Sequence, residues 1–351
     1  MSIPYRTRRK LKKLAVFLVV LAVLLALAVV AFVVYLERYI IYTRQGVVLD
    51  MEMDPTISLA GAVEAMPPAE DDPVEIYYNE GENAVAMNKD LEPVWGYYIT
   101  TQDLVNNIAL CRERIALLES GTAVMIELKN GFGTYNYATG ISGAKITDGV
   151  DTQAVSALIQ DLNSRNLYVI GRISAFRDRD YGLTHVNQGI YHVNRKGLWP
   201  DDQHCYWMDP TNQAVLSYVS QVLGEVKTMG FDEIVLADFK IPGSDKALFN
   251  GDKTEALTKA AEIIMTNVEA DTFNLSFMVD SAAFPLPGER NRLYLDTVAA
   301  ERVGAAVSVT EIEKKDVFLV FVASSADTRY DDYGVLRPLA LSDVLGGSKP
   351  E

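Results

Sequence analysis

The sequence predicts an α/β protein in which a (β/α)8, TIM-like barrel follows a single transmembrane helix. Three observations support this prediction: a long apolar run near the N-terminus, an acidic segment up to residue 93, and a regular pattern beyond it. From residue 94, short apolar runs alternate with amphipathic ones over about 250 residues. Such alternation is typical of parallel strands, and its length suits a barrel better than two Rossmann halves.

The apolar run from Leu14 to Leu36 contains 23 residues and no charge. As a helix it would span about 34 Å, which is enough for a bilayer core of roughly 30 Å. Residues 1–13 ahead of it carry six bases and no acid. These bases are Arg6, Arg8, Arg9, Lys10, Lys12 and Lys13. We expect the N-terminus to be cytoplasmic, the chain to cross the cell membrane once, and the barrel to be extracytoplasmic.

A cleaved signal peptide is the competing interpretation of the same run. Ala26, Leu27 and Ala28 have the small-x-small form of a cleavage site. The run continues to Leu36, however, so cleavage there would leave an apolar new terminus. The sequence therefore favours an uncleaved signal anchor that contacts the lipid bilayer.

The overall charge hides a strongly acidic exported part. The chain has 351 residues, 32 Lys and Arg against 47 Asp and Glu, a net charge of −15, and a mean hydropathy of +0.06. Without the six N-terminal bases, 26 bases remain against 47 acids, a net of −21. An acidic surface argues against nucleic acid as a partner, and 49% hydrophobic residues exclude a mainly disordered chain.

Cysteine and histidine are too scarce to build a metal site or a disulfide framework. The chain has two cysteines and three histidines, and the histidines are not at ligand spacing. We therefore expect no metal and no cofactor. Cys111 and Cys205 are most simply unpaired, although an exported protein leaves a disulfide open.

Residues 37–93 are predicted to form an extracytoplasmic stalk. They contain 13 acids and 3 bases, and Pro67 and Pro68 interrupt them. One or two strands are expected there, at Val47 to Met51 and at Val74 to Tyr78.

The barrel is assigned to residues 94–345, with 346–351 as a tail. Its predicted strands are Val94 to Thr100, Ala123 to Lys129, Leu167 to Phe176, Glu233 to Lys240, Phe273 to Asp280, Ala305 to Thr310 and Val317 to Ala323. Its predicted helices are Gln102 to Leu118, Thr152 to Asn166, Asn212 to Met229, Lys253 to Val268 and Arg292 to Glu301. Asp151 and Thr211 are expected N-caps, and Gly230 is expected to end the third helix.

Only seven strands are predicted, and the last two have no room for a helix between them. Residues 311–316 are too few, so we expect the final third of the barrel to be irregular or incomplete.

Charged side chains follow the predicted strands, at the end where barrel enzymes carry their active sites. They are Glu127, Lys129, Arg172, Asp178, Asp180, Asp238, Lys240, Asp280 and Glu311. Glycoside hydrolysis needs a carboxylate pair, one member protonated and one ionised. The long loops 130–150 and 177–210 add aromatic residues that could stack on sugars. These are Phe132, Tyr135, Tyr137, Tyr181, Trp199, Tyr206 and Trp207.

Four segments together resemble one known family. They are VMIELKNGFGTYNY (124–137), LYVIGRISAFRDRDY (167–181), KGLWPDDQHCYWMDP (196–210) and GFDEIVLADFKIP (230–242). The chain resembles the bacterial "putative glycoside hydrolase domain" family, whose α-amylase-like (β/α)8 barrel is often anchored to the cell surface by one helix. The resemblance covers residues 94–245 well and the remainder loosely.

The resemblance implies roles for individual residues. Glu127 and Lys129 match an acid and a lysine after the second strand, and Arg172 matches an arginine on the third. Trp199 and the segment from Trp207 to Pro210 match the loop that leads into the third helix.

The fourth strand departs from the family pattern. The family usually has Asp-Tyr two residues after FDEI, followed by Arg-Phe-Pro. Without a gap, that Asp falls on Ala237, the Tyr on Asp238 and the Arg on Lys240. A carboxylate displaced by one residue points to the other face of a strand unless a bulge restores it.

Our hypothesis is a membrane-anchored glycoside hydrolase-like protein that acts on an envelope or extracellular polysaccharide. Asp238 and Asp280 are the expected catalytic pair, with Glu127 next. Substrate-binding side chains are expected at Lys129, Arg172, Lys240, Trp199, Trp207 and Tyr135. Two alternatives stay open, namely an inactive barrel that only binds glycan and an envelope scaffold without glycan affinity.

Overall fold

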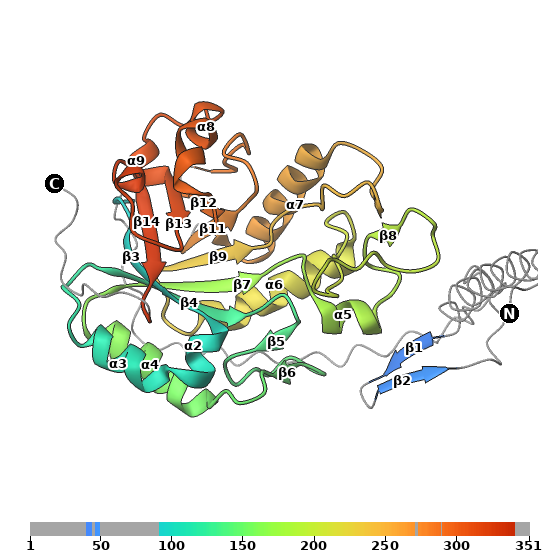
Figure 1. Cartoon of the computed structure of the whole chain (residues 1–351), viewed down its shortest axis with the longest axis horizontal. Coiled ribbons are helices and arrows are strands. Elements are labelled where there is room, and N and C mark those ends of the chain that lie inside the picture. The colour runs from blue at the N-terminus through green and yellow to red at the C-terminus, as the bar shows by residue number, and fades with distance from the viewer. Residues whose placement is uncertain (1–39, 44–45, 50–90, 271–272, 289, 341–351) are drawn as a thin grey trace, which may run out of the picture. The chain divides into compact units, whose positions relative to one another are not determined.

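The computed structural model describes residues 40–43, 46–49, 91–270, 273–288 and 290–340 (Figure 1). The chain divides into two units, residues 1–81 and 82–351. In the first, β1 (Ile40–Thr43) pairs antiparallel with β2 (Gly46–Leu49). The predicted membrane helix, most of the stalk and the tail 346–351 lie outside the described residues. No helix in the described part of the chain is long and apolar enough to cross a bilayer.

The second unit is a closed barrel of eight parallel strands. In chain order they are β3 (Trp95–Ile99), β4 (Ala123–Lys129), β7 (Tyr168–Ser174), β9 (Glu233–Ala237), β11 (Asn274–Met278), β12 (Leu293–Asp296), β13 (Leu319–Val322) and β14 (Gly334–Pro338). Each strand pairs with the next, and β14 pairs with β3 to close the ring. The predicted barrel is therefore confirmed, and the expectation that it could be incomplete is wrong.

The helices of the first half lie close to where the sequence predicts them. They are α2 (Thr101–Asn106), α3 (Ile108–Ile115), α4 (Thr152–Ser164), α6 (Gln213–Lys227) and α7 (Lys253–Asn267). Asp151 caps α4 by accepting hydrogen bonds from the backbone of Gln153 and Ala154. Helix α6 is capped by Asn212 and not by Thr211, whereas Gly230 follows it with a φ of +85°.

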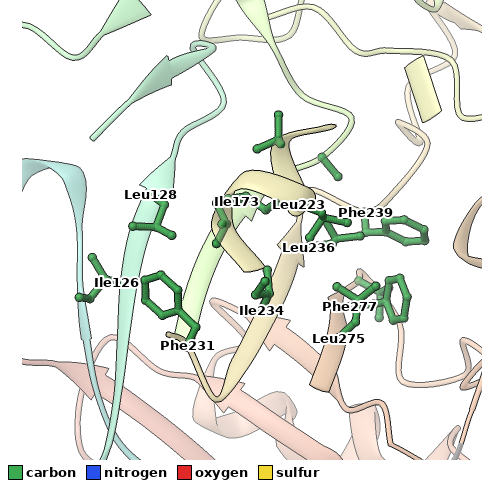
Figure 2. Close-up of a cluster of buried hydrophobic side chains, with 14 of the residues drawn as sticks. Ile126, Leu128, Ile173, Leu223, Phe231, Ile234, Leu236, Phe239, Leu275 and Phe277 are labelled. Carbon is green, nitrogen blue, oxygen red and sulfur yellow. The ribbon is translucent and has the colours of Figure 1, made fainter. Parts of the chain in front are cut away.

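The hydrophobic core lies between the strands and these helices. In α4, Val155, Leu158, Ile159 and Leu162 are buried, and their spacing places them along one face of the helix. Figure 2 shows part of this core, in which side chains of β4, β7, β9 and β11 and Leu223 of α6 belong to one cluster. Burial of each large aliphatic side chain stabilises the fold by about 1.5–3 kcal/mol.

The interior of the barrel is also packed, so it is not a channel. The second core cluster comprises Val94, Ala123, Met125, Ile170, Val235, Ala237, Met278, Tyr294, Val320, Val322 and Leu336. Side chains alternate between this lumen and the helix layer along each strand. Only the ends of the barrel are left for chemistry.

The last third of the barrel differs from the sequence prediction in three places. The predicted helix from Arg292 contains β12 and a short 3-10 turn, η3 (Ala300–Arg302). The predicted strand from Ala305 is part of α8 (Val303–Ser308). Strand β14 was not predicted at all.

The connections in this third are short, as expected. The helical segments that follow α8 in the described part of the chain are α9 (Lys315–Phe318) and η4 (Thr328–Tyr330). The strands there have four or five residues, too few to show a period, so pairing with neighbours decides their state.

Two long loops cover the carboxyl ends of the strands. Loop 130–150 contains β5 (Thr134–Tyr135) and β6 (Lys145–Ile146). Loop 177–210 contains α5 (Arg179–Thr184) and β8 (Tyr191–His192), and β8 pairs with β10 (Ala247–Leu248) beyond β9. Figure 1 shows α5 and β8 beyond the tips of β7 and β9.

Candidate active site at the carboxyl ends of the strands

Asp238 is turned toward the barrel interior by its backbone. Ala237 before it occupies the lumen, so a regular strand would point Asp238 outward. Its φ is instead +52°, a left-handed conformation that costs roughly 1–3 kcal/mol in a residue other than glycine. Ser174 Oγ, at the end of β7, donates a hydrogen bond of 2.6 Å to Asp238 Oδ2. Local geometry thus offsets the one-residue displacement noted in the sequence.

Arg172 links two other carboxylates at this end of the barrel. Its Nη1 donates to Glu127 Oε1, and its Nη2 lies 3.8 Å from Asp296 Oδ2. Glu127 is held from its other side by the backbone N–H of Thr101, at 2.9 Å. The side chains of Arg172 and Glu127 are 19% and 14% exposed. A guanidinium at this position stabilises ionised carboxylates around it.

Asp296, at the end of β12, is the residue that sequence reasoning missed. Its side chain is 40% exposed, but partial desolvation raises its pKa, and the nearby charges of Asp238 and Glu127 raise it further. Arg172 and Lys240 act in the opposite direction without cancelling the shift. Asp296 therefore retains its proton to higher pH than an ordinary aspartate.

The signal that could have found Asp296 is the segment RLYLD at 292–296. It is a short apolar run that ends in a carboxylate, and a barrel with seven predicted strands needs one more. Tyr98, from β3, lies beside the same site. Burial raises the pKa of Tyr98, and the Asp296 charge adds to this effect.

Asp280 and Lys240 form an ion pair at the rim of the site. Lys240 Nζ lies 2.8 Å from Asp280 Oδ1, and it stands over the Trp207 ring, 5.5 Å from the centroid. The Asp280 side chain is 63% exposed, whereas Trp207 is 5% exposed. Trp207 Nε1 donates to Asp201 Oδ2 at 3.2 Å. The Asp280 side chain is therefore more exposed than those of Glu127 and Asp296, which are 14% and 40% exposed.

Lys129 and Tyr135 are placed in a buried polar network, away from any ligand-accessible surface. Both are 1% exposed. Lys129 Nζ lies 2.7 Å from Asp178 Oδ2 and donates to the backbone oxygen of Ser174 at 3.0 Å. Tyr218 donates to the same Asp178 oxygen and shares a hydrogen bond with Tyr135. This network supports the end of β7, which carries Ser174.

Two further predicted residues also lie apart from the carboxylates. Trp199 is half-buried and packs against the main core. Glu311 is exposed and follows α8, so it does not lie at the end of a strand.

Cys111 and Cys205 are both buried and free. No group of three or more potential metal ligands occurs among the described residues.

Eight parallel strands that close on themselves, with helices in the connections between them, define the class of (β/α)8 barrels. A family model described as "Putative glycosyl hydrolase domain" matches residues 96–279, more than half of the chain. The chain belongs to this family. The matched region contains Glu127, Arg172 and Asp238 and ends before Asp280 and Asp296.

Solved structures with a similar fold include a hypothetical protein from Ruminiclostridium thermocellum ATCC 27405. It is 22% identical with a TM-score of 0.45, and the match covers 52% of this chain and 96% of that one. The GH36 α-galactosidase AgaA from Geobacillus stearothermophilus is 10% identical with a TM-score of 0.46, over 74% of this chain and 40% of that one. The chitobiase of Flavobacterium johnsoniae is 11% identical with a TM-score of 0.45, over 67% and 38%.

The chain thus spans about two fifths of the length of the α-galactosidase and the chitobiase. No curated protein matches the sequence.

Proposed function

We propose that this protein is a membrane-anchored, extracytoplasmic glycoside hydrolase that cleaves O-glycosidic bonds with Asp238 and Asp296. One observation carries the proposal: two carboxylates from the fourth and sixth barrel strands share the neighbourhood of Arg172 but have different environments. A carboxyl group whose environment raises its pKa, beside a second carboxylate, can supply the acid of an acid–base pair.

The environments assign the roles. Asp296, whose pKa is raised, is the general acid that protonates the leaving-group oxygen. Asp238 accepts a hydrogen bond from Ser174 and acts as the ionised partner, either attacking the sugar or activating water. Arg172 and Glu127 position the pair and balance its charge.

Asp296 replaces Asp280 in the pair that the sequence suggested. Asp280 is paired with Lys240 at 2.8 Å and its side chain is 63% exposed, whereas Asp296 lies beside Arg172. In this proposal Lys240 and Asp280 belong to the rim of the substrate site.

The anchor is proposed from the sequence alone. Six bases precede 23 uncharged residues, which favours a cytoplasmic N-terminus and an exported barrel. Proteolysis of intact cells tests the orientation: an externally added protease should digest the barrel, and full protection in cells that remain sealed would contradict the proposal.

The catalytic pair is tested by turnover of soluble glycans by the full-length protein. Asp238→Asn and Asp296→Asn should each lower kcat/KM by about 10²–10⁴-fold, the usual contribution of an acid or base. Glu113→Gln, which changes an exposed carboxylate on α3, is the matched control and should stay within about threefold of the parent. Undiminished turnover in the first two variants would overturn the assignment.

A further inference from the structure

A hollow lies between the loops that follow β7 and β9. The antiparallel pair β8 and β10 connects these loops, and a hydrogen bond of 2.8 Å from Val193 N to Lys246 O adds to this pairing. The hollow has a volume of about 430 Å³. Pockets that hold small ligands have volumes of roughly 300–1,000 Å³.

The lining combines flat aromatic side chains with polar ones. The aromatic side chains are Tyr191, in β8, and Phe249, directly after β10. The polar groups are the Asn187 amide, the Arg195 guanidinium and the Asp209 carboxylate. Asp209 Oδ1 accepts hydrogen bonds from Thr211 N at 2.8 Å and Thr211 Oγ1 at 2.7 Å. These bonds fix the carboxylate, which leaves its other oxygen available.

Neither charged group is neutralised within the described residues. No side chain or backbone group of residues 91–270, 273–288 and 290–340 donates to Asp209 Oδ2 or accepts from the Arg195 guanidinium. The backbone of Arg195 is held at a φ of +56° by its N–H bond of 2.7 Å to His192 O. A left-handed residue in a tight turn is a strained position of the kind that recurs at ligand sites.

The floor of the hollow is tied to the candidate active site. Gly189 pairs with the Trp207 segment, and a Cβ at Gly189 would lie 2.9 Å from Trp207 O, so this close approach requires glycine. The Trp207 ring in turn lies under Lys240, which pairs with Asp280 at the rim. The hollow and the carboxylates are thus connected through Trp207 and Lys240.

We propose that this hollow is a glycan subsite that binds a further stretch of an uncharged oligosaccharide or polysaccharide substrate, a deepening that rests on the proposed hydrolase function. A sugar ring presents an apolar C–H face, which suits Tyr191 and Phe249. It also presents neighbouring hydroxyls, each a donor and an acceptor, which suit a carboxylate beside a guanidinium. One positive and one negative side chain give the lining no net charge, which favours a neutral chain.

Binding is tested by native gel electrophoresis of the full-length Asp238→Asn protein in gels that contain starch, galactomannan, xylan or mixed-linkage β-glucan. We expect retardation by at least one of these polymers. Adding Phe249→Ala or Arg195→Ala should weaken that retardation at least fivefold. Arg112→Ala, which changes an exposed arginine on α3, is the matched control and should leave it unchanged. Because Arg195 is exposed, its variant should fold even where Phe249→Ala fails.

Kinetics separate this inference from the proposed function. With Asp238 intact, Arg195→Ala should raise KM for the polymer about tenfold with kcat within twofold, and should leave hydrolysis of a small aryl glycoside unchanged. Polymer KM and retardation equal to the parent's would overturn the subsite even if Asp238 and Asp296 prove catalytic. Retardation that depends on Arg195 in a protein without turnover would support the subsite and reject the hydrolase.

Discussion

An arginine–carboxylate cluster lies near each end of the barrel, and the two clusters differ in burial. Near the amino ends of the strands, Arg292 and Glu233 are 1% and 0% exposed and lie 2.5 Å apart. Near the carboxyl ends, Arg172 and Glu127 are 19% and 14% exposed, and Asp296 beside them is 40% exposed. One arginine–glutamate pair is therefore buried, and the other is partly exposed to solvent.

Several hydrogen bonds hold Arg292 in the buried cluster, whereas Glu233 Oε1 has no hydrogen-bond partner among the described residues. Arg292 donates to Val317 O, Glu92 O and Tyr168 Oη as well as to Glu233. Burial alone would lower the pKa of Arg292, but the Glu233 charge together with Tyr168 and Tyr294 outweighs it and raises the pKa. The cluster ties β7, β9 and β12 to the segment before β3.

The open cluster has more carboxylates than it has arginines. Burial alone would lower the pKa of Arg172, but the charges of Glu127, Asp238 and Asp296 each raise it. Desolvation raises the pKa of Asp296 most, and the charges of Asp238 and Glu127 raise it further, against Arg172 and Lys240. The comparison teaches that an equal match of charges makes a structural tie, whereas a surplus of carboxylates near water makes a group that can exchange a proton.

The largest effect is expected from Arg292→Met. Removal of the guanidinium leaves Glu233 buried without its counter-charge, which costs about 3–5 kcal/mol of unfolding free energy. Urea denaturation followed by circular dichroism measures the change. Adding Glu233→Gln should restore part of the loss, and a single variant as stable as the parent would show that the buried tie contributes nothing.

An intermediate effect is expected from Arg172→Met. Because the pair is partly exposed, the loss of its charged hydrogen bonds should cost about 1–3 kcal/mol. Arg172 lowers the pKa of Asp296, so its removal raises that pKa further. Activity that needs protonated Asp296 falls as pH rises through this pKa, and the alkaline limb of kcat/KM should therefore move to higher pH. A limb that moves to lower pH would contradict Asp296 as the acid.

The smallest effect is expected from Lys259→Ala. Lys259 pairs with Glu255 at 2.6 Å on α7, but both side chains are more than 60% exposed. Water and salt screen such pairs, so we expect no measurable change in the urea midpoint. A clear loss of stability would mean that exposure is a poor guide to the weight of ion pairs in this protein.

The first half of the barrel could be predicted because its helices are long. Helix α4 repeats buried residues over 13 positions, and β4 has the predicted bounds from Ala123 to Lys129. In the second half, β12 has four residues and α8 six, so neither shows a full period. The segment at 292–296 was read as a helix because its paired neighbours, β11 and β13, are distant in sequence.

The candidate site was predicted in part for the same reason. Positions at the ends of well-predicted strands pointed to Glu127, Arg172 and Asp238, which the structure brings close together. Asp296 is absent from the predicted site because its strand, β12, is predicted as part of a helix. Lys129 also ends a strand, but a register shift after Glu127 breaks the alternation, and the side chain is buried against Asp178.

By itself the sequence determined the barrel class, the family, the acidic charge of residues 37–351 and the polar ends of four strands. These features depend on composition and on local periodicity, which a linear chain displays. The tertiary structure decided the closure by β12 and β14, the inward turn of Asp238, and the separation of one buried from one open cluster. Those features arise from backbone torsion, strand pairing and exposure to water, which exist only once residues distant in the chain are in contact.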